Sequence, residues 1–471
     1  MDDLTLLPAV ETARRIRAKK ISPVQIADAH LAKIDRLNPK LNAYVHVDAE
    51  RVRREARLAE SSLMYGASLG PLHGVPISIK SSIDVAGMRC ESGTPLRAGH
   101  IAEEDAPLVA RLRQAGAIIL GVTNTPEMLM AWETDNLLYG RTNNPWDLER
   151  TPGGSSGGEA AAIACGMSAG GVGSDGGGSI RVPAHFSGIC GLKPTPGRIP
   201  STGHFPESGG PFALIGVVGP MARTVADLRI LFEIMQGPDD GDTCAAPVPI
   251  RWPDEKETKG LRIGFFEDDD RTPVAPEIRK AVRAAAESLG RAGFIVERFR
   301  PEGLEEARDL WKKFFVKMGG MLIGPMYDER EQVANPMLKE FLKWSAAEPS
   351  LSGPAVLDAW IRRDVTRGNF LAQMRKYPIL LCPAAAISAF RHGERNWTVE
   401  GKNVHYLDAW SYTEWFNLLG NPAAVVPVSH SAEGLPIGVQ IVGRPWEEEQ
   451  VLSVAEVVER ECGGWKIPPI H

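Results

Sequence analysis

The stretch from Thr151 to Pro194 constrains the fold of this chain more than any other. It holds eleven glycines between Gly153 and Gly178, ten of them in three clusters, and each cluster adjoins a serine. Glycine loses the most conformational freedom on folding and contributes no side chain, so this density needs a structural reason. The usual reason is a backbone that approaches another group closely or adopts angles that a Cβ atom forbids. Serines held in such a backbone predict a catalytic site built from hydroxyls and main-chain N–H groups.

Strand and helix signals alternate along most of the chain. Strands are expected in a segment ending at residue 80 and at 117–122, 169–174, 261–266, 294–299, 377–381, 423–428 and 437–442. Helices are expected at about 22–37, 49–63, 105–116, 126–132, 159–167, 224–235, 277–292 and 447–460. Such alternation is typical of an α/β fold. With no repeat or linker in the sequence, we expect a single domain over residues 1–471.

The segment 303–376 is rich in helix signals and shows no clear strand. Its apolar residues recur with the spacing of one helical face: Trp311, Phe314, Phe315, Met318, Met321, Leu322 and Met326. Two interpretations fit this pattern, a helix that faces the core and an apolar wall over a substrate pocket. The pattern alone favours the core-facing helix. We interpret the whole segment as a helical insertion on the substrate side of the domain.

Composition excludes several classes of function. The net charge is −6 and basic residues are interspersed with acidic ones, which argues against a nucleic-acid-binding protein. The longest weakly polar runs, 160–173 and 378–390, are shorter than the roughly 18 residues needed to span a bilayer. Six cysteines without CxxC pairs indicate free thiols in a reducing compartment rather than disulfides or zinc. Because the N-terminus also lacks a signal-peptide pattern, we expect a cytoplasmic protein.

Two short motifs in the glycine-rich stretch indicate known folds, but their surroundings fit poorly. Gly153–Gly157 matches the nucleophile elbow G-x-S-x-G, which requires a strand before the turn, whereas 148–152 is polar and contains proline. Gly171–Gly176 matches the dinucleotide-binding motif G-x-G-x-x-G, which requires an acidic residue about 20 positions later. The stretch 191–201 contains no such residue.

A third motif combines Lys80, Ser155 and Ser179. The two serines are 24 residues apart (179 − 155), and the lysine lies 75 before the first of them (155 − 80). A serine hydroxyl is a poor nucleophile until a base takes its proton. Lysine, with a pKa of about 10.4, becomes such a base when burial lowers that pKa by about 3 units. Lys80 ends an apolar strand, although Asp84 would oppose the shift if it folded back.

This combination resembles the amidase signature family. The likeness is carried by the following segments: 73–80, 123–127, 153–158, 175–181, 190–195, 219–223 and 434–440. The resemblance implies an α/β fold in one large domain, with a twisted mixed sheet flanked by helices and a glycine-rich core at about 70–230. It also implies a cis peptide bond between Gly154 and Ser155.

The resemblance implies a catalytic triad and a reaction. Ser179 corresponds to the nucleophile, Ser155 to the bridging serine and Lys80 to the base. The family's reaction is hydrolysis of a carboxylic amide to an acid and an amine or ammonia through an acyl-serine intermediate. Neither a cofactor nor a metal is implied. The expected ligand is a small-molecule amide, and because members of the family often dimerise, a homodimer is compatible with the resemblance.

The glycines before the nucleophile are expected to bind the oxyanion. Gly176, Gly177 and Gly178 present successive N–H groups, which form a natural site for the negative charge of a tetrahedral intermediate. Asp175 and Arg181 flank them. Two interpretations of these flanking charges stand equally: a pair that holds the N–H groups in place, and an ordinary surface ion pair.

The expected substrate is a hydrophobic acyl or aryl amide. Residues 128–132 are apolar, and in related enzymes the residue corresponding to Leu129 contacts the substrate through its backbone. The alternative within the family is the glutaminase subunit of a tRNA-dependent amidotransferase. Residues 130–136 differ from the Gly-Ser-Ser-rich segment expected of that subunit. A binding protein without catalysis is a further alternative, although all three triad residues are present.

Overall fold

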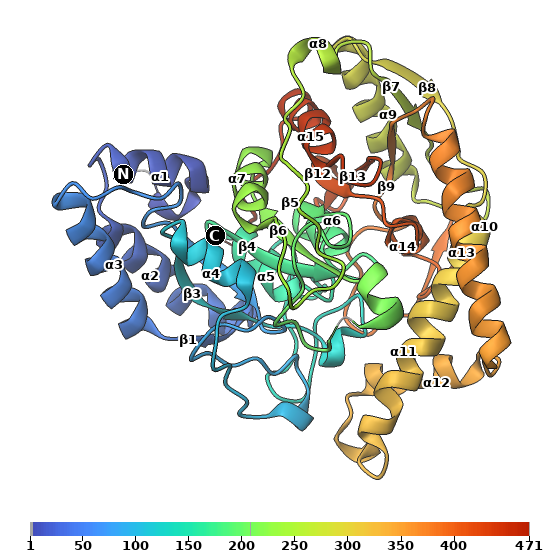
Figure 1. Cartoon of the computed structure of the whole chain (residues 1–471), viewed down its shortest axis with the longest axis horizontal. Helices are drawn as coiled ribbons and strands as arrows, with labels where there is room; N and C mark the ends of the chain where they lie inside the picture. The colour runs from blue at the N-terminus through green and yellow to red at the C-terminus, as the bar shows by residue number, and fades with distance from the viewer. Residues whose placement is uncertain (1–2, 208, 471) are drawn as a thin grey trace.

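A mixed sheet of eleven strands forms the centre of the molecule (Figure 1), and the computed structural model describes residues 3–207 and 209–470. Along the sheet the strands follow the order β1-β3-β2-β4-β6-β5-β12-β13-β9-β7-β8. Their bounds are β1 Tyr44–Val47, β2 Pro76–Lys80, β3 Ile118–Thr123, β4 Gly170–Asp175, β5 Cys190–Lys193, β6 Val217–Ala222, β7 Arg262–Phe265, β8 Ile295–Arg298, β9 Ile379–Pro383, β12 Ala423–His430 and β13 Pro436–Val442. A separate hairpin joins β10 Asn396–Val399 to β11 Lys402–His405.

Helices pack along this sheet. They are α1 Ala9–Arg17, α2 Pro23–Leu41, α3 Ala49–Met64, α4 Pro107–Gln114, α5 Gly157–Ala164, α6 Arg181–Ser187, α7 Val225–Met235, α8 Glu255–Thr258, α9 Pro276–Arg291, α10 Leu304–Trp311, α11 Met318–Ile323, α12 Pro336–Ala347, α13 Gly353–Gln373, α14 Ser411–Leu418 and α15 Glu448–Cys462. Figure 1 shows α1–α3 at one end of the sheet and α10 and α13 at the other. Within the described residues, no helix combines the length and apolar character needed to cross a membrane.

The strands that carry the site are buried along their whole length. Every residue of β2, β3 and β4 is buried, and β2 pairs in parallel with both of the others. Parallel strands covered by helices on both faces consist of nearly continuous apolar or small residues. β2 and β3 show this with their isoleucines and valine, and β4 with its glycines. Lys80, the last residue of β2, therefore lies in the interior of the protein.

The segment after residue 303 is helical, as the sequence predicts. α10 continues through the π-helical stretch Lys312–Lys317 into α11, and α12 and α13 follow. Both interpretations of its apolar face apply, each to different residues. Trp311 and Phe314 are buried in the core, whereas Phe315 and Leu322 line a cavity.

Two sequence predictions about local structure need correction. The expected helix over 126–132 is only a single 3-10 turn, Glu127–Leu129, because Met128 and Leu129 adopt left-handed φ angles of 53° and 67° that no helix continues. The strands β1, β5 and β6 of the sheet are absent from the predicted set. β6 contains Gly219 and Pro220, which ordinarily argue against a strand, yet it lies between β4 and β5 within the sheet.

Candidate active site

Lys80 lies at the end of β2 in a pocket of serine hydroxyls. Its side chain is fully buried, and its Nζ lies 2.6 Å from Oγ of Ser155 and 3.0 Å from Oγ of both Ser156 and Ser174. These serines come from two places, the loop before α5 and the end of β4. The three hydroxyls match the three positions that a lysine amine can fill with hydrogen bonds.

The environment of Lys80 favours the neutral amine. Burial lowers the pKa of Lys80 to about 7, an effect that the negative charges of Asp175 and Glu159 partly oppose. The sequence analysis considered Asp84 as a charge that would oppose this shift. Asp84 is not among the groups that shift the pKa of Lys80. A substantial fraction of Lys80 is therefore unprotonated at neutral pH and available as a base.

The loop that carries Ser155 has an unusual backbone. Its Gly154–Ser155 peptide bond is cis, as the family resemblance implied. The next residue, Ser156, donates its backbone N–H to the carbonyl of Ser179 at 3.1 Å. This hydrogen bond connects the loop that carries Ser155 to the segment that carries Ser179. Residues 151–156 form loop rather than a strand, so the nucleophile-elbow interpretation does not fit.

The dinucleotide-binding interpretation also fails on geometry. The residues that match its glycine pattern, 171–176, fall almost entirely within β4. That motif requires its glycines in the turn between a strand and a helix, where the helix N-terminus faces a pyrophosphate. Here the glycines serve close packing inside the sheet instead.

The glycine segment before Ser179 is anchored through its carbonyl oxygens. The indole N–H of Trp311 donates to the carbonyl of Gly176 at 3.0 Å, and the carbonyl of Gly177 accepts from Trp132 Nε1 at 2.8 Å and from Thr413 Oγ1 at 3.0 Å. In a trans peptide the following N–H points away from the carbonyl. Anchoring these carbonyls therefore also fixes the directions of the next two N–H groups.

Trp311 also explains why position 177 is glycine. A Cβ atom on Gly177 would lie 2.6 Å from Cζ2 of Trp311, too close for any real contact. The indole ring packs directly on the backbone, as the glycine density in the sequence had indicated. This contact brings α10, from the helical segment, onto the backbone beside Ser179.

Asp175 and Arg181 form a fully buried pair, so the interpretation as a surface ion pair is wrong. Arg181 donates from Nε to Oδ2 at 3.0 Å and from a terminal nitrogen to Oδ1 at 2.9 Å. Burial opposes ionisation of Asp175, but the nearby Arg181 and further donors hold its pKa well below the usual range. The ionised Asp175 accepts the N–H of Gly178 at 2.7 Å and that of Ile180 at 3.0 Å, so it fixes the backbone on both sides of Ser179.

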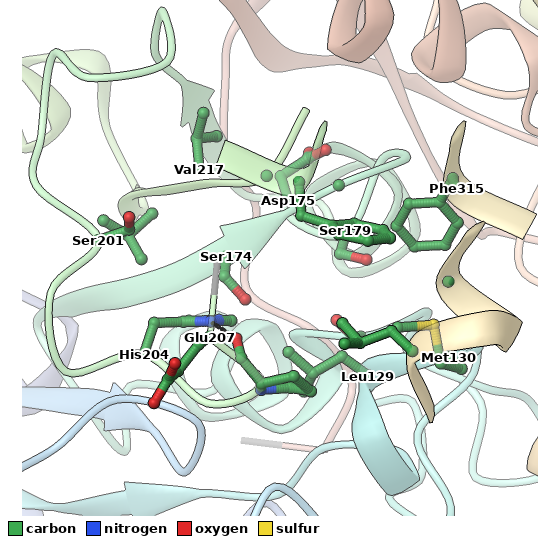
Figure 2. Close-up of a pocket in the computed structure, with 18 of the residues that line it drawn as sticks. Leu129, Met130, Ser174, Asp175, Ser179, Ser201, His204, Glu207, Val217 and Phe315 are labelled. Carbon is green, nitrogen blue, oxygen red and sulfur yellow. Dashed lines mark hydrogen bonds between the residues drawn. The ribbon is translucent and has the colours of Figure 1, made fainter. Parts of the chain in front are cut away.

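A cavity opens beside these serines, and Ser155, Ser174 and Ser179 all line it. The rest of its lining includes the apolar side chains of Leu129, Met130, Phe212, Val217, Phe315 and Leu322. Two carboxylates, Asp175 and Glu207, also line it. Figure 2 shows Phe315 and Met130 on the same side of the cavity as Ser179. Among the described residues that line the cavity, none is lysine or arginine.

The sequence analysis missed Ser156 and Ser174, which contact Lys80, and two further residues near the site. His204 lines the cavity opposite Phe315 (Figure 2), and burial lowers its pKa to about 4, so it is neutral. No motif placed the loop around it near the serines. Glu159 is buried close to Lys80, and its signal was available, since it is the only charged residue in α5. No group of three or more His, Cys, Asp or Glu side chains suited to a metal ion occurs in the described part of the chain.

Comparison with known proteins identifies the family. Residues 25–452 match the family model described as Amidase. The chain belongs to the amidase signature family. It is therefore a hydrolase of the class that acts on carbon–nitrogen amide bonds, and the eleven-stranded mixed sheet flanked by helices is this family's fold.

Similar members of the amidase signature family differ in what they act on. The indoleacetamide hydrolase of Bradyrhizobium diazoefficiens is 34% identical over 97% of this chain and 86% of its own length. One subunit of the glutamyl-tRNA(Gln) amidotransferase of Carboxydothermus hydrogenoformans is 32% identical over 99% of both chains. The crystal structure of a bacterial aryl acylamidase of the family matches with a TM-score of 0.85 and 25% identity, over 97% of this chain and 96% of its own.

Proposed function

We propose that this amidase hydrolyses hydrophobic acyl or aryl amides through an acyl-enzyme on Ser179. The observation that carries the proposal is the buried amine of Lys80, which contacts serine hydroxyls and has a pKa of about 7. A lysine in water is almost fully protonated at neutral pH and cannot act as a base. Here the amine lies 2.6 Å from Ser155, and both Ser155 and Ser179 face the cavity.

The proposed reaction begins with proton transfer through Ser155. Neutral Lys80 takes the proton of Ser155, which in turn takes the proton of Ser179 as its Oγ attacks the amide carbon. The tetrahedral intermediate collapses, the carbon–nitrogen bond breaks, and the leaving nitrogen receives the proton. Water then attacks the acyl-Ser179 ester, with Lys80 and Ser155 again passing the proton, and the acid is released.

The oxyanion is expected to bind backbone N–H groups of the glycine segment. The N–H of Gly178 already donates to Asp175 at 2.7 Å. We therefore assign the oxyanion to the N–H groups of Gly176, Gly177 and Ser179, and assign to Gly178 the task of holding the segment in shape. A donor fixed before the reaction, as the N–H of Gly177 is by the anchored carbonyl of Gly176, stabilises the developing charge without reorganising.

The lining of the cavity, which is largely apolar and includes the carboxylates Asp175 and Glu207, supports an apolar substrate without a negative charge. Glutamine carries a carboxylate and an ammonium group, and burying that carboxylate without a cationic partner costs several kcal/mol. No lysine or arginine is among the described lining residues. This disfavours the glutaminase function, although the amidotransferase relative is similar over the whole chain. The apolar lining agrees better with substrates of the kind named for the indoleacetamide hydrolase and the aryl acylamidase.

A fluorophosphonate probe tests the proposed roles of the serines. We expect one covalent adduct, located by peptide mass spectrometry on Ser179. The adduct should be absent in Ser179→Ala and should form much more slowly in Lys80→Ala, because the serine loses its base. An adduct on Ser155 would reverse the roles of the two serines. The absence of any adduct in the wild type would contradict the proposed function.

A panel of amides tests the substrate class. We expect kcat/KM for phenylacetamide and indole-3-acetamide to exceed that for glutamine by about 100-fold or more, since removing charge mismatch in a buried site is worth about 3 kcal/mol. Acetamide, which is small and uncharged, separates the effect of charge from that of apolar contact. Faster hydrolysis of glutamine than of either aryl amide would favour the amidotransferase alternative.

A further inference from the structure

A buried carboxylate lies beside the proposed base. Glu159 is fully buried and is the only charged residue of α5, whose other residues are small or apolar. Burying a carboxylate is costly unless it is hydrogen-bonded or paired with a charge. The proposed reaction gives this residue no task, so its presence needs a physical reason.

Both oxygens of Glu159 accept hydrogen bonds from the strands around Lys80. Ser78 Oγ donates to Oε1 at 2.5 Å, and Thr123 Oγ1 donates to Oε2 at 2.7 Å. Ser78 precedes Lys80 by two residues on β2 and therefore shares its face of the strand. Thr123 is the residue of β3 paired directly with Lys80. The carboxylate thus joins the two strands at the point where the lysine leaves the sheet.

A third strand makes room for this carboxylate. Gly171 of β4 pairs with Ser78, and a Cβ atom on it would lie 1.9 Å from Oε1 of Glu159. Only glycine fits there. Three strands and one helix therefore form a closed site for a single carboxylate.

The charges of the pair act on each other. Burial raises the pKa of Glu159 to about 7, against the effects of its two hydroxyl donors and of Lys80. The pKa of Lys80 falls to about 7, and its opposing charges are Asp175 and Glu159. Asp175 is neutralised by its ion pair with Arg181, so Glu159 is the carboxylate without a cationic contact of its own.

The other titratable groups that face this pair do not change charge near neutral pH. His204 feels the charge of Lys80, but burial keeps its pKa at about 4. Tyr44 feels the charge of Glu159, and burial raises its pKa far above neutral. Lys80 and Glu159 are therefore the two groups here whose charges change near neutral pH, and the charge of each affects the pKa of the other.

We propose that Glu159 is a positioning residue for Lys80, which fixes the end of β2 against β3 and sets, through its charge, the pH at which Lys80 becomes a neutral base. The inference rests on the proposed function of Lys80. It extends that function by adding a second group whose charge affects the pKa of the base.

The pH profile of kcat/KM tests this inference, because its acid limb reports the ionisation of the base in the free enzyme. Glu159→Gln keeps the shape and the hydrogen-bonding capacity but removes the charge. We expect the acid limb to move down by about 1 to 2 pH units, as expected for one charge at close range in an environment of moderate polarity. Glu459→Gln is the matched control, since burial raises the pKa of Glu459 also to about 7 but its contacts are with Val225 and Cys190.

A second variant, Thr123→Val, tests the inference if Glu159→Gln does not fold. Thr123→Val removes one donor to the carboxylate, so Glu159 should hold its proton to higher pH and the acid limb should again move down, by a smaller amount. An unchanged limb in a folded Glu159→Gln enzyme, whatever its absolute rate, would overturn the inference. The fluorophosphonate adduct on wild-type Ser179 separates the two failures. If it forms while the limb stays unchanged, the proposed function stands; if it does not form, both fall.

Discussion

Replacing Lys80 with methionine is expected to lower kcat for amide hydrolysis by about 10⁴-fold or more. Methionine is similar in length and apolar, so it fills the buried site without a charge. The loss follows because the structure places the lysine amine against the serine hydroxyls, 2.6 Å from Ser155. Steady-state kinetics with an aryl amide measures the effect, and circular dichroism verifies that the variant is folded.

Ser179→Ala is the reference for that experiment. Residues that act as one catalytic unit are not additive, so the double variant should be about as slow as either single variant. Wild-type activity should rise with pH through about 7, because the pKa of Lys80 is about 7 and only the neutral amine accepts a proton. A Lys80→Met enzyme that kept more than about a tenth of wild-type kcat would exclude lysine as the base, since general base catalysis contributes more than that.

Arg181→Met is expected to lower the free energy of unfolding by about 3–5 kcal/mol, which is typical when one partner of a buried ion pair is removed. The loss arises because Asp175 remains buried with its negative charge unpaired. Arg181 also donates to Gln440 at 2.6 Å and to Asn417, so three elements lose contacts together. Urea denaturation followed by tryptophan fluorescence measures the change.

Arg362→Met is the matched control for this stability effect. Arg362 pairs with Glu306 on the surface, with both side chains partly exposed, and such pairs contribute at most about 1 kcal/mol. Equal losses of unfolding free energy in the two variants would show that burial of the Asp175–Arg181 pair does not increase its contribution to stability. A folded Arg181→Met enzyme should also lose activity, since Asp175 holds the N–H groups of Gly178 and Ile180.

The elements of the fold were predictable where the local pattern of apolar residues matches the burial of those residues in the structure. The apolar run before Lys80 predicted β2, and the helix expected at about 22–37 is present as α2, which Ser22 caps. The prediction failed where the backbone takes angles that a residue-type pattern does not reveal. Met128 and Leu129 are ordinary helix formers, yet both adopt left-handed angles, so the predicted helix ends after one turn, and Leu129 lines the cavity.

The sequence predicted those residues of the site that belong to recognisable motifs. The spacings of Lys80, Ser155 and Ser179 suggested a shared site, and the structure brings Lys80 to Ser155 and places both serines on one cavity. The burial of the Asp175–Arg181 pair could not be inferred, because the residues that cover it, such as Asn417 and Gln440, lie more than 230 positions later in the chain. Glu159 was missed, although it is the only charged residue of α5, because a single charge in a helix is usually exposed.

The position of β12 and β13 has a consequence for how the enzyme is made. These strands come late in the sequence, yet they lie inside the sheet between β5 and β9, and Gln440 of β13 accepts a hydrogen bond from Arg181. During synthesis, a growing chain leaves an unfilled gap in its sheet and an incompletely bonded Arg181 until residue 440 has left the ribosome. The segment around Ser179 therefore acquires its final support only near the end of translation, and we expect unfinished chains to be inactive.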